Sequence, residues 1–345
     1  MIMNLVLNTF GTYLHRDGEM FVINIKNEKD ENKKREVSAR KVRSILITTG
    51  AALSTDAIRL AIERNIDIVF MNSFGEPYGR VWHGRPGSTT AIQREQLRLA
   101  DTERGVGFAR SWMTRKLDNQ LLFLQEARSR RTRLHSVLTE KIEALSVSRQ
   151  SIDALTGSTL DDIRGTLIGF EGRAGRTYWE AISLLMPDQF KFDGRSRNPA
   201  KDEFNCLLNY AYGVLYSIVE RACVIAGIDP YVGFVHTDHY QKKSFVFDLV
   251  ECYRIWADHA VVSLFSTRKV NMELFDSLQN GLRLNKTGKE LLISVFDAYL
   301  DEIVQYRGRN IKRRDTVQFD CHHLANEWIG RVDGEDYGNI SLDYV

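Results

Sequence analysis

The sequence predicts an α+β protein in which an N-terminal β-rich domain precedes a larger, all-α catalytic domain. Its 345 residues are enough for two domains of ordinary size. Short apolar runs separated by turns fill the first part of the chain, and this pattern stops at the Gly- and Pro-containing segment His83–Thr89. Helix-forming residues with few breakers dominate beyond it. We therefore expect a β-rich domain over residues 1–85, a linker over 86–90 and a helical domain over 91–345.

The first domain is expected to contain five short strands and one helix. In Phe21–Ile25 a period near two competes with continuous apolar character, as expected where one face of a sheet is buried. The segment Asn27–Glu36 consists of charged residues and asparagines, which predicts a solvated hairpin tip. Ser54 or Thr55 can cap a helix over Asp56–Arg64. The strands are expected at Leu5–Leu7, Glu19–Ile25, Ser44–Thr48, Ile66–Met71 and Tyr78–Trp82.

Helices are expected to fill the second domain. From residue 92 to about 146 only Gly105 and Gly107 interrupt the helical pattern. Another long helix is expected over about 160–185. A later helix over 244–251 is predicted to begin with Ser244 as its cap.

The composition is that of a soluble globular protein, with 43% hydrophobic and 27% charged residues, and it excludes a disordered or membrane class. The net charge of +2 does not decide for or against a nucleic-acid partner, because binding depends on local charge, such as the basic segment Arg307–Arg314. Four scattered cysteines without a CxxC pair fit a reducing compartment. No apolar run approaches the roughly 18 residues that span a bilayer, so we expect a cytoplasmic protein with no membrane partner.

Four residues stand out as candidates for chemistry. Glu171 is followed by small residues at 172, 174 and 175, which favours close approach of another element or a ligand. His236 ends a short apolar piece, and Asp248 and Glu251 lie three residues apart on one helical face. Taken singly, these features are typical of an exposed glutamate, a core histidine and a solvated helix face. Together, carboxylates and one imidazole suit Mg²⁺ or Mn²⁺, and such a site suits phosphodiester chemistry.

These residues lie in sequence blocks that together resemble the integrase family of CRISPR adaptation, the universal CRISPR-associated protein usually numbered one. The blocks follow the order of the family and cover about residues 5–310, whereas the tail from Arg313 lies outside the resemblance. The blocks are Gly50–Ser54, Lys116 with Asn119 and Gln120, Phe170–Gly172 with Ala174, Arg197–Pro199 with Asp202 and Asn205, Leu208–Tyr212, Gly227–His236, and Asp248–Glu251 with Arg254.

The resemblance implies a site in which Glu171, His236 and Glu251 hold Mg²⁺ or Mn²⁺, with Asp248 as a further catalytic position near the metal. The implied reaction is DNA integration by transesterification, in which a protospacer 3′-hydroxyl attacks a phosphodiester of the CRISPR array. The same site implies metal-dependent endonuclease activity. Two other readings stay open, namely a stand-alone structure-selective nuclease on branched DNA and a DNA-binding scaffold without catalysis.

The resemblance also implies partners. These are double-stranded DNA, a second copy of the chain in a homodimer formed through the β-rich domain, and the small CRISPR-associated partner protein numbered two. Two integrase dimers are expected to bracket one partner dimer in a heterohexamer.

Basic and polar residues of the helical domain become candidates for DNA contacts, with Arg197 first among them. Tyr210 either faces DNA or fills the core. The remaining candidates are Arg173, Arg176, Lys116, Asn205 and Arg254. Histidines without carboxylate partners at motif spacing are expected to have no function in the site, although His239 is the nearest alternative to His236. These are His15, His83, His239, His259, His322 and His323.

Overall fold

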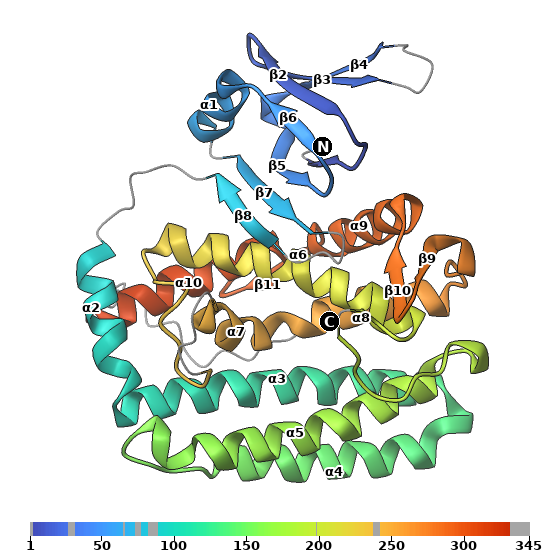
Figure 1. Cartoon of the computed structure of the whole chain (residues 1–345). Helices are drawn as coiled ribbons and strands as arrows, with labels where there is room; N and C mark the ends of the chain where they lie inside the picture. Colours follow the sequence, from blue (N-terminus) through green and yellow to red (C-terminus); the bar gives the residue numbers. More distant parts are fainter. Residues whose placement is uncertain are drawn as a thin grey trace. The chain divides into compact units, whose positions relative to one another are not determined.

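The chain divides into two units, residues 1–86 and 87–345. The computed structural model describes residues 3–26, 32–64, 66–72, 77–81, 89–197, 199–236 and 242–331. The first unit is rich in strands and the second is mainly helical (Figure 1). The predicted α+β class is therefore confirmed.

Two four-stranded sheets form the first unit. In one sheet three neighbouring strands are parallel and the last is antiparallel; its order is β1 (Met3–Leu7), β5 (Val42–Ile47), β7 (Asp67–Met71) and β8 (Pro77–Val81). In the other sheet three strands form an antiparallel meander, and the fourth runs parallel to its neighbour. Its order is β4 (Asn32–Ser38), β3 (Met20–Lys26), β2 (Thr12–Asp17) and β6 (Ala51–Leu53).

Helix α1 (Thr55–Glu63) packs apolar side chains into the same core as the strands. Its cap is Ser54, whose hydroxyl accepts a hydrogen bond from the Ala57 amide at 3.1 Å. Ser54 was one of the two caps predicted from the sequence. The expected hairpin tip over 27–36 is wrong in its second half, because residues 32–38 form strand β4. The backbone of β4 pairs with β3 whatever its side chains are, and charged side chains suit an edge strand.

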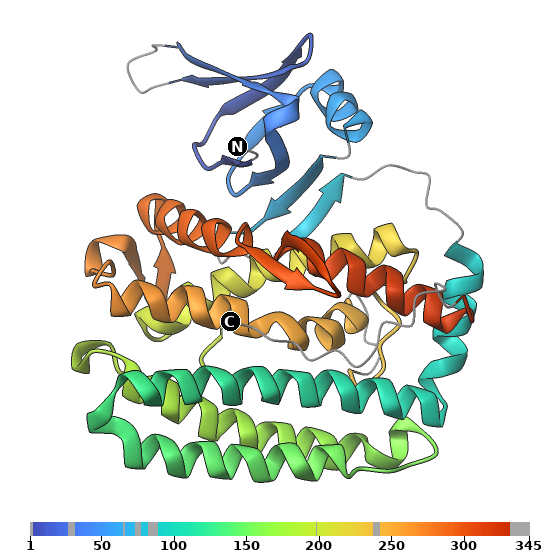
Figure 2. The ribbon, with the colours of Figure 1, turned by 180° about the vertical axis from the view of Figure 1, so that it is seen from behind.

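The second unit is built from nine described helices. Three of them, α3, α4 and α5, run side by side, as the front and back views both show (Figures 1 and 2). In order the helices are α2 (Thr89–Ala100), α3 (Glu103–Arg130), α4 (His135–Asp153), α5 (Leu160–Leu185), α6 (Glu203–Ala226), α7 (Ser244–Val250), α8 (Arg254–Ser266), α9 (Lys286–Leu300) and α10 (Asp315–Trp328).

Two features of this unit differ from the sequence-based expectation. It is not purely helical, because it also contains the hairpins β9 (Phe275–Leu278) with β10 (Gly281–Leu284) and β11 (Ile303–Tyr306) with β12 (Arg309–Lys312). The sequences of β9 and β11 do not alternate strictly between apolar and polar residues, so they carry no clear strand pattern. Ser244 is not the cap of α7 but its first helical residue, and Lys243 precedes it without a side-chain capping bond.

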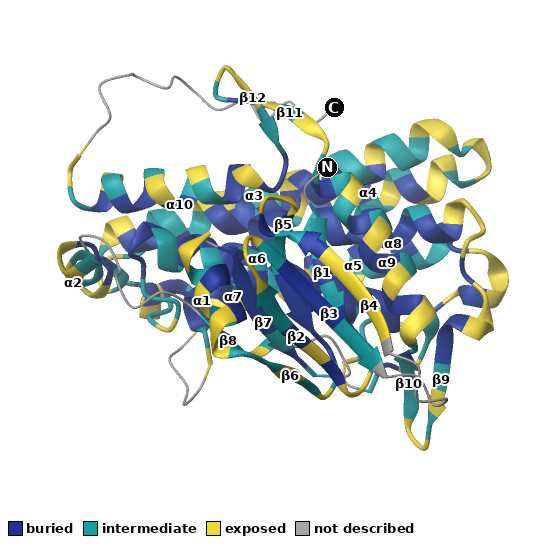
Figure 3. Ribbon diagram, turned by 90° about the horizontal axis from the view of Figure 1, so that it is seen from above, coloured by how far each residue is buried: buried dark blue, intermediate teal, exposed yellow. Residues whose placement is uncertain are grey.

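Buried and exposed residues lie on different faces of the helices (Figure 3). Helix α6 is buried along most of its length, and its core includes Phe204, Leu208 and Leu215. It ends at Gly227, whose φ of +82° is the left-handed conformation that glycine adopts readily. No helix in the described part of the chain is long and apolar enough to cross a membrane.

Candidate metal centre

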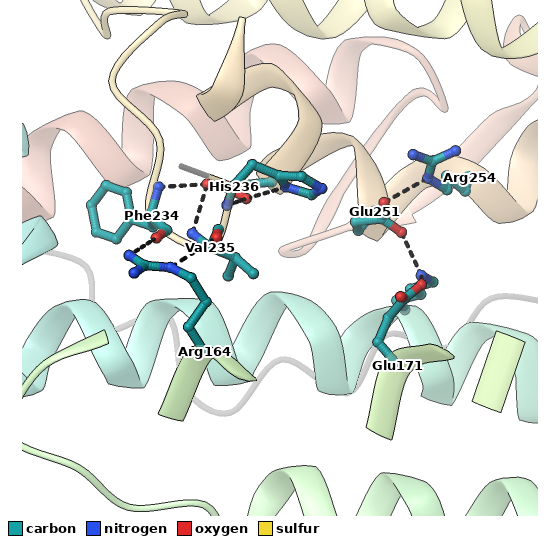
Figure 4. A network of polar contacts seen from close by, with 9 residues as sticks. Arg164, Glu171, Phe234, Val235, His236, Glu251 and Arg254 are labelled. Carbon is teal, nitrogen blue, oxygen red and sulfur yellow. Dashed lines mark hydrogen bonds and ion pairs between the residues drawn. The ribbon is translucent and has the colours of Figure 1, made fainter. Parts of the chain in front are cut away.

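Two candidate carboxylates meet at a lysine. Glu171 comes from the middle of α5, and Glu251 opens the 3₁₀ turn Glu251–Tyr253 between α7 and α8. Lys116 reaches them from α3, and its Nζ lies 2.5 Å from Oε1 of Glu171 and 2.7 Å from Oε2 of Glu251. The side chain of Glu171 points toward Glu251 (Figure 4). The sequence placed the two glutamates in one site, and the structure brings them together across this ammonium group.

Glu251 is buried between two cations. Its Oε1 accepts a hydrogen bond from Nε of Arg254 at 2.8 Å, while Oε2 lies 2.7 Å from Nζ of Lys116. Burial on its own would raise the pKa of Glu251, but the charges of Arg254 and Lys116 outweigh it and lower the pKa to about 2. Glu251 is therefore an ionised, buried carboxylate whose two oxygens each face a cation.

Helix α3 also holds the backbone of the turn that carries Glu251. Asn119 lies one helical turn after Lys116, and its Nδ2 donates to the carbonyl oxygen of Cys252 at 2.9 Å. One helix face therefore supplies both the cation and the bond that places the turn. Asn119 belongs to the blocks of the resemblance, but we assigned it no role from the sequence.

His236 is fixed by Asp248. The Nδ1 atom of His236 lies 2.6 Å from Oδ1 of Asp248, and this carboxylate also accepts the amides of Phe234, Val235 and His236 at 2.6, 3.1 and 2.9 Å. Asp248 is buried, whereas the side chain of His236 is 46% exposed. With Nδ1 donating to the carboxylate, Nε2 carries the lone pair that a metal needs.

The loop before His236 is held from two further helices. Gln96 on α2 is buried; its Nε2 donates to the carbonyl oxygens of Asp229 and Val232, both at 2.9 Å, and its Oε1 accepts the Asp229 amide at 2.9 Å. Arg164 on α5 donates to the carbonyl oxygens of Phe234 and Val235 at 3.2 and 3.1 Å.

A tight turn at Gly233 lets the loop pass close to its neighbours. A Cβ atom there would lie 2.2 Å from the carbonyl oxygen of His236, a distance that real Cβ atoms do not show. Sequence reasoning missed Gln96 and Arg164. The signal for Gln96 is that a polar residue stands on the apolar stripe that includes Ile92 and Leu99.

The predicted ligands are assembled in part. Glu171 and Glu251 share one cation, and the imidazole of His236 lies beside them with its Nδ1 turned to Asp248 (Figure 4). Within the residues that the structure describes, no three His, Cys, Asp or Glu side chains gather as a metal cluster. The donors still fit a hard divalent ion, because two carboxylates, one of them buried, converge on a single positive charge.

The predicted DNA contacts divide into exposed and buried residues. Arg173 and Arg176 on α5 and Arg197 are exposed, so the DNA role of these three stays a prediction. Asn205 and Tyr210 are buried, which corrects the expectation of a DNA contact for Asn205 and, of the two alternatives for Tyr210, favours the core. Asn205 is occupied inside the fold, where its Nδ2 donates to Gly194 and Asp202 at 3.0 and 2.7 Å.

Lys116 is also buried and Arg254 is partly buried, and both contact Glu251. The expectation that Lys116 contacts phosphate directly is corrected as well, because its ammonium is buried between two carboxylates, whereas the DNA role of Arg254 stays a prediction. Of the other histidines, His15 stacks on Tyr13 and His259 stacks on Tyr299. His83 and His239 lie outside the described residues.

Comparisons with known proteins agree on one family. Residues 5–298 match the family model described as CRISPR associated protein Cas1. A relative from Archaeoglobus fulgidus, named CRISPR-associated endonuclease Cas1 1, is 33% identical over 321 residues, which cover 90% of this chain and 91% of the relative. One from Saccharolobus solfataricus, named CRISPR-associated endonuclease Cas1 2, is 30% identical and covers 76% of this chain and 75% of the relative.

Solved structures share the fold. A casposase bound to an integration product superposes with a TM-score of 0.80 at 22% identity, covering 97% of this chain and 93% of the other. A Cas1 protein from Thermotoga maritima superposes with a TM-score of 0.76 at 22% identity, covering 95% and 97%. Since the family model spans most of the sequence and a relative above 30% identity covers 90% of it, the chain belongs to the Cas1 family of CRISPR-associated proteins.

Proposed function

We propose that this protein is a divalent-metal-dependent DNA integrase of CRISPR adaptation that uses Mg²⁺ or Mn²⁺. The observation that carries the proposal is the convergence of Glu171 and Glu251 on one positive charge, beside an imidazole whose Nδ1 is engaged by Asp248. The names of the relatives, which are endonucleases, and the integration product of the casposase support phosphodiester chemistry at this site.

Glu171, Glu251 and Nε2 of His236 would hold the ion. When bound, a divalent ion polarises the scissile phosphate and lowers the pKa of an attacking hydroxyl. Glu251 is ionised at neutral pH because Arg254 and Lys116 lower its pKa to about 2 against the effect of burial. Asp248 orients the imidazole through Nδ1, and the amides of residues 234–236 keep Asp248 itself in place.

The proposed reaction exchanges one phosphodiester for another. The 3′-hydroxyl oxygen of the incoming strand bonds to phosphorus and releases its proton, while the bond from phosphorus to the 3′-oxygen of the array strand breaks and that oxygen takes up a proton. No high-energy cofactor is needed, since the bonds formed and broken are of one kind. Water in place of the 3′-hydroxyl gives hydrolysis at the same residues.

The proposed assembly follows the family. Double-stranded DNA is the substrate, the β-rich unit makes a homodimer, and two dimers bracket one dimer of the small partner. A chain of a Cas6-RT-Cas1–Cas2 complex has the same fold over 96% of this chain, with a TM-score of 0.76 at 19% identity, and the presence of Cas2 in that complex supports a Cas2 partner here.

A strand-joining assay tests the proposal. Full-length protein is incubated with Mn²⁺ or Mg²⁺, a labelled duplex with free 3′-hydroxyls and a plasmid that carries a CRISPR repeat. We expect labelled plasmid with the wild type and, for Glu171→Gln, a loss of about a hundredfold or more, because a metal ligand contributes several kcal/mol to the transition state. Glu180→Gln is the matched control, since Glu180 is exposed on the same helix and pairs with Lys141.

The two other readings give different results. Cleavage of branched DNA by the wild type without any joining would favour the stand-alone nuclease. The relatives' names, which include the word endonuclease, are also consistent with this alternative. Binding of DNA with neither cleavage nor joining, under all metal conditions, would favour the scaffold. Joining by Glu171→Gln at the wild-type rate would remove Glu171 from the site.

A further inference from the structure

Lys116 occupies an unusual position for a lysine. Its side chain is only 7% exposed, and its ammonium contacts carboxylates from two different elements, Glu171 on α5 and Glu251 in the turn after α7. In the described part of the chain these are its ion pairs. Long charged side chains are rarely buried unless they are paired, so the two carboxylates account for the burial of Lys116.

The charges of this cluster cancel. Glu171 and Glu251 contribute two negative charges, and Lys116 and Arg254 contribute two positive ones. Arg254 binds Oε1 of Glu251, so Lys116 is the cation at the other oxygen, Oε2, and at Oε1 of Glu171. Removing Lys116 would leave two carboxylates facing each other in a poorly solvated place, which is costly.

We propose that Lys116 is a resident counter-ion that takes the place of the metal in the metal-free protein, and that a divalent ion binds only by moving this ammonium away from Glu171 and Glu251. The inference rests on the metal site of the proposed function. A metal ion that takes Oε1 of Glu171 and Oε2 of Glu251 takes the two atoms that Lys116 contacts. Two cations cannot share these atoms without strong repulsion, so ammonium and metal compete.

Competition has two consequences of opposite sign. Lys116 stabilises the metal-free fold, and it weakens the binding of the metal, because the ion pairs must be broken first. A lysine that only supports the architecture of the site would have effects of the same sign, since its loss would lower both stability and metal affinity. The two measurements together therefore distinguish a counter-ion from a scaffold residue.

The experiment uses the full-length protein and Mn²⁺ alone, with free Mn²⁺ measured by electron paramagnetic resonance and stability measured by thermal unfolding in EDTA. For Lys116→Met we expect a lower Tm in EDTA and Mn²⁺ binding that is about tenfold tighter or more. Lys116→Gln should behave alike, so a folding defect of one variant does not end the test. The ratio of the Mn²⁺ affinity of the variant to that of the wild type should be the same at ~0.5 M salt, because salt screens long-range repulsion but not competition between cations at contact distance.

Two further variants make the outcome specific. Lys289→Met is the matched control, because Lys289 is another buried lysine of this unit and contacts the ring of Tyr210, so its loss should leave Mn²⁺ affinity unchanged. Glu171→Gln should weaken Mn²⁺ binding if the metal site itself is right. If both Lys116 variants bind Mn²⁺ as tightly as the wild type or more weakly, while Glu171→Gln binds it more weakly, the counter-ion proposal is contradicted and the metal site is retained. Unchanged binding by Glu171→Gln overturns both.

A measurement on the wild type covers the case in which neither Lys116 variant folds. Acetylation of Lys116, followed by mass spectrometry, should become faster when Mn²⁺ is added, because the ammonium then leaves its ion pairs. Acetylation of Lys116 at the same rate with and without Mn²⁺ contradicts the displacement.

Discussion

At the scale of single residues, Asp248 shows how one buried carboxylate can order a loop and a ring at once. It accepts three consecutive backbone amides and contacts Nδ1 of His236. Burial lowers the pKa of His236, but the hydrogen bond and the charge of Asp248 outweigh it, so the pKa lies above the ordinary value of 6.5. The stability that this pair contributes is therefore present below pH 6.5 and is lost as the pH rises through the folded-state pKa.

Asp248→Asn should lower the pKa of His236, because it removes the negative charge beside Nδ1. A metal ligand must be a neutral imidazole, so wild-type joining should decline as the pH falls through a value above 6.5, and that of the variant at a lower pH. The variant should also lose about 1–3 kcal/mol of unfolding free energy through the lost acceptor. A proton NMR titration of His236 in the metal-free protein measures the shift, and an unchanged midpoint would contradict the assignment.

Asp258 is a second buried carboxylate, and its surroundings raise its pKa. It accepts hydrogen bonds from the hydroxyls of Tyr178 and Tyr212 at 2.9 and 2.7 Å. Burial raises the pKa of Asp258 from 3.8 to about 6, although both tyrosines and the nearby Arg195 and Arg254 act in the opposite direction. The folded protein therefore holds this proton at a pH at which the unfolded chain has lost it.

The contribution of Asp258 to stability should fall as the pH rises from 3.8 to about 6 and stay constant above that range. Urea unfolding of wild type and Asp258→Asn at a series of pH values measures this contribution. Across this range the unfolding free energy of the wild type should fall relative to that of Asp258→Asn. Asp193→Asn, at an exposed position, is the control and should show a constant difference. The same flat difference for Asp258→Asn would refute the prediction.

At the scale of elements, three helices fix the segment that ends in His236. Gln96 binds it from α2, Arg164 from α5 and Asp248 from α7. Arg164 and Glu171 are seven residues apart on α5, which is about two helical turns, so one helix face holds the loop and also presents a carboxylate. The start of α5 is defined by Asp162, whose Oδ2 accepts the Thr159 amide at 2.9 Å.

Gln96→Ala should release the segment over 229–232 from α2. Three hydrogen bonds of a buried side chain are lost and their partners stay buried, so we expect a loss of about 2–3 kcal/mol and faster hydrogen exchange at the Asp229 amide. Hydrogen exchange read by mass spectrometry, together with urea unfolding, checks both effects. Arg98→Ala, exposed on the same helix, should change neither. If hydrogen exchange at the Asp229 amide is unchanged in Gln96→Ala, the segment over 229–232 does not depend on Gln96 for its order.

At the scale of the whole molecule, a net charge of +2 conceals an uneven distribution. Lys116 and Arg254 are positive, but both are paired with Glu251 in the candidate metal centre. Arg173, Arg176 and Arg197 are positive and exposed in the same unit. Exposed arginines are the ones whose charge can displace counter-ions from DNA.

Arg197→Ala should weaken the binding of double-stranded DNA and reduce the slope of log affinity against log salt by about one. Fluorescence anisotropy over a range of salt concentrations measures this slope. The comparison variant is Asn205→Ala, which should lower stability and leave the slope unchanged, because Asn205 is buried and bonded to Gly194 and Asp202. A wild-type slope for Arg197→Ala would give Arg197 a structural role.

Local patterns were sufficient for much of the fold. Runs of helix formers predicted the long helices, and a Ser or Thr before Asp56 predicted the start of α1. Strand β4 was missed because its pairing with β3 is a backbone property that its charged side chains conceal. The hairpin strands Phe275–Leu278 and Ile303–Tyr306 were missed because neither alternates strictly between apolar and polar residues.

The sequence by itself determined the α+β organisation, the family resemblance and the residue types of the site, since these depend on local propensity and on the order of short blocks. Only the tertiary structure decided that Lys116 stands between Glu171 and Glu251 and that Gln96 holds Asp229. The members of these contacts are 55 or more residues apart in the chain. Such contacts follow from how helices pack, which no pattern within a single helix specifies.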